Sequence, residues 1–271
     1  MSQQEPLTPH AVIVGVPLDE NSSFLRGPAL APARIRAALS SGSMNLCTED
    51  GDDLGSRTEW RDAGDLEIGH GTAVMCGIER QIAALATEGA RILSLGGDHS
   101  VTYPIVRALA AHYPTLTILH FDAHPDLYGD FDGNPYSHAS PFARIMEERL
   151  ARRLVQVGIR TMNPEQKAQA ERFGVEVIPM RRFSRDLPLE LEAPLYISLD
   201  LDVLDPAFAP GVSHHEPGGL SVRDVLDVLA GITVPVVGAD IVEYNPVRDH
   251  GERTAMVAAK FYKELLGLLI R

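Results

Sequence analysis

The sequence predicts an α/β protein, a three-layer αβα sandwich built on a mainly parallel sheet. Short β-branched apolar runs alternate with amphipathic stretches along the chain, and the runs have the composition of strands buried on both faces. This alternation places helices on both sides of a parallel sheet. The expected strands are 11–16, 91–95, 116–121, 154–159, 175–179, 195–202 and 234–242. The expected helices are 72–89, 103–113, 221–231 and 254–270.

Composition limits the class of protein. With 271 residues, 45% of them hydrophobic, we expect residues 1–271 to form one globular domain. The net charge of −13 argues against a nucleic-acid partner, because phosphate backbones are bound by clustered Lys and Arg. No stretch approaches the roughly 18 apolar residues of a membrane span, and the polar N-terminus lacks a secretory signal pattern. Cys47 and Cys76 form no disulfide framework, so we expect a cytoplasmic protein.

Two segments without strand or helix patterns are expected to be long loops, 41–60 and 205–219. The second is rich in Pro and Gly and directly follows an expected strand. In open α/β sheets, ligands bind beyond the carboxyl ends of the strands. Loops at that edge are therefore the first place to look for a functional site.

Three clusters of acidic residues and histidines follow expected strands: GGDHS (96–100), DAHPD (122–126) and DLD (200–202). A single carboxylate at a strand end is more often a cap or turn residue, but three clusters at one edge are harder to explain in this way. Alternate residues of a strand point to one face, so the aspartates and histidine of DAHPD converge if extended geometry persists through Ala123 and Pro125.

Carboxylates crowded in this way repel one another and raise their own pKa values unless cations hold them. Four aspartates balance two divalent ions, and a two-metal site is a common means of making a hydroxide nucleophile at neutral pH. A ligand set of two imidazoles and four carboxylates, without a thiolate, suits Mn²⁺ better than a structural Zn²⁺ ion. We therefore expect a site for two Mn²⁺ ions per chain.

The motifs G-G-D-H-S, D-A-H-x-D and S-x-D-x-D-x-x-D-P, in this order, resemble the ureohydrolase family of arginases and agmatinases, which hydrolyse guanidinium groups to urea and an amine. The resemblance extends from 15–36 to 236–249, and the segments 133–146 and 205–221 look like plant-type arginases. It implies an arginase-like fold. The metal ligands that it implies are His99, Asp122, His124, Asp126, Asp200 and Asp202.

The resemblance also implies three catalytic residues. Glu243 matches the glutamate that holds the guanidinium, a cation that needs an anionic partner. His138 matches the histidine that protonates the departing amine, although by sequence alone it could equally belong to the cap of a helix starting near Ala139. Asp126 has a second expected role, to accept a hydrogen bond from the hydroxide and orient it.

Substrate choice depends on groups away from the metals, because arginine and agmatine differ only in the α-carboxylate. Asn134 and Ser137 are the candidates for binding that carboxylate, although turn formation also explains Asn134. Asn163 and Gln166 are neutral where animal-type arginases carry acidic residues that bind the α-amino group. His214 lies in a loop that could line the substrate tail, as does His215.

Arginase activity is the function that these motifs favour, with agmatinase or another guanidino hydrolase as the alternative. Two further readings are a mononuclear zinc deacetylase of related fold and a catalytically silent binding subunit. The deacetylase needs only an Asp/His/Asp set, and a silent relative is expected to have lost a ligand. The resemblance implies a homo-oligomer, with a hexamer suspected. Four histidines outside the clusters are expected at the surface or in packing: His10, His70, His112 and His250.

Overall fold

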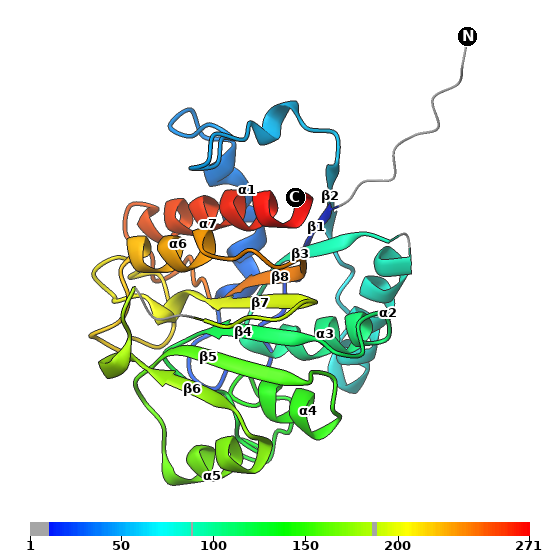
Figure 1. The fold of residues 1–271 in the computed structure, drawn as a ribbon, viewed down its shortest axis with the longest axis vertical. Helices are drawn as coiled ribbons and strands as arrows, with labels where there is room; N and C mark the ends of the chain where they lie inside the picture. The colour runs from blue at the N-terminus through cyan, green and yellow to red at the C-terminus, as the bar shows by residue number, and fades with distance from the viewer. Residues whose placement is uncertain (1–10, 88, 186–188) are drawn as a thin grey trace.

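The computed structural model describes residues 11–87, 89–185 and 189–271, which contain one eight-stranded sheet (Figure 1). The strand order is β2-β1-β3-β8-β7-β4-β5-β6, and each neighbouring pair is parallel. The strands are β1 (Ala11–Gly15), β2 (Trp60–Asp65), β3 (Arg91–Leu95), β4 (Thr117–Phe121), β5 (Arg153–Ile159), β6 (Glu176–Pro179), β7 (Leu195–Asp200) and β8 (Val236–Val242). The predicted parallel α/β sheet is confirmed.

Helices cover both faces of the sheet, as the three-layer prediction requires (Figure 1). One face carries α1 (Ala31–Leu39), α6 (Val222–Ala230) and α7 (Arg253–Ile270). The other face carries α2 (Val74–Thr87), α3 (Thr102–Ala110), α4 (Pro141–Glu147) and α5 (Pro164–Phe173). Short 3-10 helices connect these elements: η1 (Pro28–Leu30), η2 (Leu54–Ser56), η3 (Gly71–Ala73), η4 (His99–Val101), η5 (Met180–Arg182) and η6 (Leu201–Val203).

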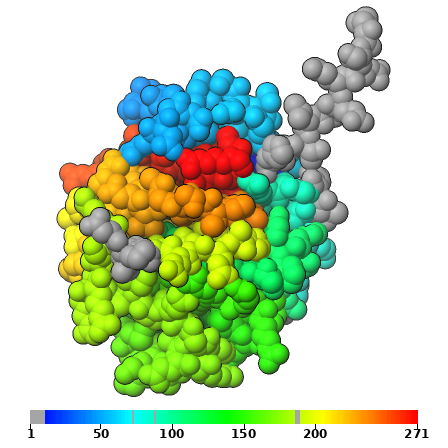
Figure 2. Space-filling view, viewed as in Figure 1, coloured from blue at the N-terminus to red at the C-terminus, as the bar shows by residue number. Residues whose placement is uncertain are grey.

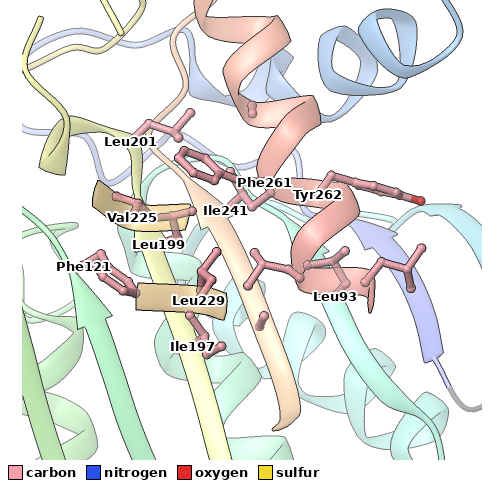
Figure 3. Close-up of a cluster of buried hydrophobic side chains, with 14 of the residues drawn as sticks. Leu93, Phe121, Ile197, Leu199, Leu201, Val225, Leu229, Ile241, Phe261 and Tyr262 are labelled. Carbon is pink, nitrogen blue, oxygen red and sulfur yellow. The ribbon is translucent and has the colours of Figure 1, made fainter. Parts of the chain in front are cut away.

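The long helix α7 provides much of the core on its face of the sheet. Figure 3 shows Phe261 of α7 beside Ile241 of β8 and Leu201, with Val225 of α6 nearby, and all four belong to one buried cluster. Burial of each such side chain contributes about 1.5–3 kcal/mol. Figure 2 shows α7 flanked on the visible face by α6 and by the segment around 41–60. The α7 helix therefore joins the sheet to the N-terminal part of the chain.

Among the strands and α-helices, the sequence analysis missed three: β2 and the helices α1 and α5. The strand β2 has the sequence WRDAGD, which lacks an apolar run because this edge strand is largely exposed. Its place beside β1 depends on backbone pairing and on ion pairs from Arg36 to Asp62 and Asp65. The local sequence pattern does not indicate these contacts. The helix expected near Ala139 begins at Pro141.

A close approach inside the sheet positions the turns that follow β4 and β7. Gly158 of β5 has a φ of 98°, and a Cβ built on it lies 2.5 Å from Val203 Cγ2 and 3.0 Å from the Asp122 carbonyl oxygen. A side chain there would push on η6 and on the end of β4 together. Only glycine fits this position without displacing either turn.

We expect Gly158→Ala to lower the free energy of unfolding by roughly 2–4 kcal/mol, because overpacking and left-handed backbone strain act together. Gly42→Ala is the control, since nothing lies within 4 Å of its added Cβ. That change should stay within about 0.5 kcal/mol of wild type. Denaturant unfolding of both variants measures the difference, and equal midpoints would contradict the argument.

Candidate active site

Four adjacent strands in the middle of the sheet, β3, β8, β7 and β4, end at the same edge. The residues predicted to carry chemistry lie there: His99 follows β3, Glu243 follows β8, Asp200 ends β7 and Asp122 follows β4. All four side chains are buried. The topology thus brings together residues that are far apart in the sequence.

The His99 ring lies among three carboxylates. Its Nδ1 atom is 3.2 Å from Asp122 Oδ2 and 3.1 Å from the Oδ2 atoms of both Asp126 and Asp200. This nitrogen is fully buried and has no hydrogen-bond partner. The ring is held at the start of η4, where Asp98 caps the helix.

A chain of hydrogen bonds fixes the tautomer of His99. Ser198 Oγ donates to Asp240 Oδ1 at 2.8 Å, so the same oxygen accepts from His99 Nε2–H at 3.0 Å. In the neutral ring, Nδ1 then carries a lone pair that faces the carboxylates. Electron-rich atoms that converge on one point without a donor between them fit a cation. The residues present therefore fit a divalent metal ion.

A second group lies beside the first. His124 Nδ1 is 3.0 Å from Asp202 Oδ2 and 3.4 Å from Asp122 Oδ1. Asp122, His124 and Asp202 have the spacing of a metal-binding group. Asp122 belongs to both groups through its two carboxylate oxygens, so it is suited to bridge two cations.

The convergence does not come from strand alternation, because extended geometry does not persist past β4 or β7. His124 N–H donates to Asp122 Oδ1 at 2.6 Å, and Asp126 has a left-handed φ of 49°. Asp200 caps η6, with Asp202 N–H donating to its Oδ1 at 2.7 Å. Tight turns, and not a continued pleat, bring the carboxylates together.

The pKa values of the clustered aspartates reflect their burial and the charges around them. Burial and the charges of Asp202 and Asp122 raise the pKa of Asp200 well above its ordinary value. Burial raises the pKa of Asp202 to about 6, despite the neighbouring His124. Burial favours a higher pKa for Asp122, but His120 and the other neighbouring histidines outweigh it and hold the pKa well below the usual range. Without a cation, Asp200 and Asp202 therefore take up protons more readily than ordinary aspartates, which relieves part of the repulsion.

Arg160 holds the turn after β7. Its guanidinium donates to the carbonyl oxygens of Asp202 at 2.6 Å, Val203 at 3.1 Å and Glu216 at 2.8 Å. A further bond reaches Leu204 at 3.3 Å. Five planar donors suit such a cluster of carbonyl groups. Arg160 thereby ties the Asp202 turn to the loop that follows it.

Glu243 and His138 form a pair next to the cluster. Glu243 has a φ of 63°, and its Oε1 accepts from His99 N–H and from His138 Nδ1–H, both at 2.8 Å. Such left-handed residues concentrate at functional sites. Although burial opposes it, the charge of His138 lowers the pKa of Glu243. Glu243 is therefore a buried anion at the edge of the site.

Ser23 contacts the other side of the His138 ring. Its N–H donates to Nε2 at 3.1 Å and its hydroxyl lies 2.8 Å from the same atom. Against the effect of burial, Glu243 raises the pKa of His138 to about 9. The Ser23 N–H opposes this rise, because a protonated Nε2 would face another N–H. His138 is therefore held between an acceptor and a donor.

A cavity of about 220 Å³ opens beside these groups, and its walls include His124, Asp126, His138 and Glu243. Asn163 also lines it, but its Oδ1 caps α5 and its Nδ2 donates to Tyr128 Oη at 2.8 Å. The volume suits a small molecule that reaches both the carboxylate cluster and the Glu243–His138 pair.

Two residues expected to bind substrate are not among the cavity-lining residues. Asn134 donates to Asn21 Oδ1 at 3.1 Å and accepts from Tyr136 N–H at 3.0 Å. Ser137 is buried, and its hydroxyl oxygen accepts from Ala139 N–H at 3.3 Å. In this arrangement, both side chains shape the turn before α4.

His214 lines the cavity, with its ring centroid 5.3 Å from that of His138 and 5.7 Å from that of Phe24. His215 is exposed and contacts the Pro210 carbonyl oxygen. Three of the histidines expected outside the site are exposed: His70, His112 and His250. The fourth, His10, lies outside the described residues.

Sequence reasoning missed four residues that shape the site: Ser23, Asp98, His120 and Arg160. Asp98 is buried between Ser100 and the backbone N–H of Asn21, at 3.0 Å from the latter, and so attaches the loop containing Ser23. The sequence held a signal for two of them: Asp98 belongs to the GGDHS cluster, and His120 is a polar residue inside the otherwise apolar run LTILHF. The others are recognisable only once the loops are folded.

Comparison with known proteins assigns the family. Residues 9–267 match a family model described as the Arginase family. The chain belongs to the arginase family. It is 51% identical over 272 residues to "Arginase 1, mitochondrial" of Arabidopsis thaliana, covering 93% of this chain and 79% of the relative. It is 35% identical over 263 residues to an agmatinase of Bacillus anthracis, covering 94% and 90%.

Solved structures of the arginase family agree. The arginase from Medicago truncatula matches with a TM-score of 0.91 at 46% identity, covering 97% of this chain and 88% of that one. The arginase-like fold and the ureohydrolase resemblance inferred from the motifs are both confirmed. In the part of the chain that the structure describes, we find no helix with the length and apolar character needed to span a membrane.

Removal of metal should destabilise this family member, because the four carboxylates then repel one another. We expect chelator treatment to lower the melting temperature and added Mn²⁺ to restore it. At a Mn²⁺ concentration one hundred times the dissociation constant, each site should add about 2.7 kcal/mol to the free energy of unfolding. Thermal melts with elemental analysis of the same samples measure this. A melting curve that is unchanged after verified metal loss would contradict the metal assignment.

Proposed function

We propose that the chain is a dimanganese arginase that converts L-arginine and water to L-ornithine and urea, with residues 1–271 acting as one catalytic domain. The observation that carries the proposal is the buried cluster of four carboxylates and two imidazoles next to the Glu243–His138 pair. We assign as metal ligands six residues: His99, Asp122, His124, Asp126, Asp200 and Asp202.

Membership of the arginase family makes the chain a hydrolase of guanidino C–N bonds. Two groups of its side chains could hold metal ions. Carboxylate oxygen and imidazole nitrogen donors without a thiolate favour Mn²⁺. When bound, two such ions would supply a water nucleophile at neutral pH.

The residues around the cluster would bind the substrate, orient the water and deliver the proton. Glu243 presents a buried negative charge that would bind the cationic guanidinium. Asp126 would orient the attacking water by accepting a hydrogen bond from it. His138 would deliver a proton to the amine as the C–N bond breaks, because a strongly basic amine leaves only when protonated.

Arginine is the preferred substrate in this proposal, with agmatine as the alternative. The higher identity to a plant arginase than to a bacterial agmatinase supports it. Asn163 is the candidate for binding the amino-acid end, because it lines the cavity. Asn134 and Ser137 remain candidates only if substrate binding rearranges their turn. His214 lines the same cavity and is a further candidate.

Urea release from arginine and agmatine tests the substrate assignment. We expect kcat/KM for arginine to exceed that for agmatine by at least about 10²-fold, because a site built for a carboxylate loses those contacts with agmatine. Purified, Mn²⁺-loaded enzyme with each compound under identical conditions gives the ratio. A ratio that favours agmatine would replace arginase by agmatinase in the proposal.

Two variants separate proton delivery from guanidinium binding. His138→Ala should retain both metal ions but turn over about 10²–10⁴-fold more slowly, because it removes a general acid. Glu243→Gln keeps the shape and removes the charge, so substrate binding should weaken along with turnover. Added imidazole should partly rescue the first variant and not the second. Metal loss in His138→Ala would overturn its assigned role.

Metal content distinguishes the remaining alternatives. A mononuclear zinc deacetylase would hold about one zinc ion per chain, whereas the proposed arginase would hold two manganese ions. A silent binding subunit would release no urea. A homo-oligomer of six chains and a cytoplasmic location also belong to the proposal; the Arabidopsis relative at 51% identity is named a mitochondrial arginase.

A further inference from the structure

A third imidazole lies beside the cluster and has no role in the proposed reaction. His120 is in β4 and is fully buried, and its Nε2 is 2.8 Å from Asp122 Oδ2. His99, His120 and Asp122 together have the spacing of a metal-binding group. Distance alone therefore permits two roles for His120, that of a metal ligand or that of a hydrogen-bond donor to Asp122.

The neighbouring strand decides between these roles. Gln156 of β5 places its Nε2 atom 2.7 Å from the Pro125 carbonyl oxygen and 3.0 Å from His120 Nδ1. A carbonyl oxygen can only accept, so the Gln156 atom that faces it must be the amide nitrogen. The reversed amide would bring two oxygens to 2.7 Å, which is repulsive. Gln156 therefore donates to His120 Nδ1.

A ring nitrogen that accepts a hydrogen bond carries no proton. In the neutral ring, the proton of His120 is then on Nε2, which points at Asp122 Oδ2. An Nε2–H group cannot coordinate a metal, because its lone pair is part of the aromatic system. The same group is a well-placed donor to a carboxylate.

We propose that His120 is not a metal ligand but a positioning residue that holds the Asp122 carboxylate in place to bridge the two metal ions. The inference rests on the proposed two-metal site. Asp122 Oδ1 accepts from His124 N–H at 2.6 Å, so each of its oxygens has one protein donor. Both oxygens keep a further lone pair for a cation. Both oxygens of the Asp122 carboxylate are thus held in position, and each can still bind a cation.

Packing prevents His120 from changing its role. Its ring centroid is 3.9 Å from that of Phe142 and 5.0 Å from that of His99, and the ring is fully buried. Rotation about the Cβ–Cγ bond would move Nε2 away from Asp122 into this packed region. The Gln156–His120–Asp122 chain is therefore a fixed unit.

The tautomer can be measured directly in the unmodified protein. Nitrogen-15 spectra of histidine-labelled protein, loaded with diamagnetic Zn²⁺ or Mg²⁺, distinguish Nε2–H from Nδ1–H rings. We expect the resonances that disappear in His120→Phe to show the Nε2–H form. An Nδ1–H form of these resonances, with a lone pair on Nε2, would overturn the proposal.

Metal binding by variants supplies the second test. Loss of a residue that orients a ligand typically weakens metal affinity by about 10–100-fold, while all ligands remain. We therefore expect His120→Phe to weaken Mn²⁺ binding by this factor and still to hold two ions at saturation. His120→Gln, which can again present an N–H to Asp122, should recover most of the affinity. A single ion at saturation, or an unchanged affinity, would overturn the proposal.

Gln156 offers a matched pair of variants. Gln156→Glu presents an acceptor to Nδ1, which favours the opposite tautomer and leaves two electron-rich atoms between His120 and Asp122. It should weaken Mn²⁺ binding more than Gln156→Met, which removes the donor without imposing the opposite tautomer. A tighter Mn²⁺ site in Gln156→Glu would mean that His120 is a ligand. These measurements need no substrate, so failure here and failure of the arginase assignment are distinguishable.

Discussion

The electrostatic repulsion among four buried carboxylates at one edge of the sheet is the constraint on which the rest of the structure depends. Asp122, Asp126, Asp200 and Asp202 lie within reach of two imidazoles and are almost fully removed from water. Such a cluster cannot remain fully ionised without cations, and the raised pKa values of Asp200 and Asp202 reflect the free-energy cost of charging them. Folding stability and metal binding are consequently linked in this protein.

The scaffold around the cluster supplies hydrogen-bond donors and acceptors that orient the candidate ligands without neutralising them. Ser198 fixes His99, Gln156 and His120 fix Asp122, and Arg160 holds the turn that carries Asp202. These contacts come from adjacent parallel strands, so their geometry depends on the register of the sheet. Precise register is in turn maintained by tight contacts such as that of Gly158 with the two turns.

The carboxylate cluster and the Glu243–His138 pair are coupled through one short helix. His99 faces the carboxylates with its ring and donates its backbone N–H to Glu243, and so η4 belongs to both parts. Ser23 reaches His138 from a loop near the N-terminus, which Asp98 attaches by accepting from Asn21 N–H. Displacement of η4 would therefore disturb the carboxylate cluster and the Glu243–His138 pair together.

The sequence alone determined the αβα architecture and the six residues offered as ligands, because buried parallel strands leave continuous apolar runs and polar clusters at their ends are conspicuous. It did not reveal β2, whose polar sequence is held by backbone pairing to β1 and by Arg36. Nor could it assign roles to His120 or Ser23. Tautomers and hydrogen-bond directions depend on atoms contributed by other strands and loops, such as Gln156 and Pro125, and only the tertiary structure brings those atoms within 3 Å of one another.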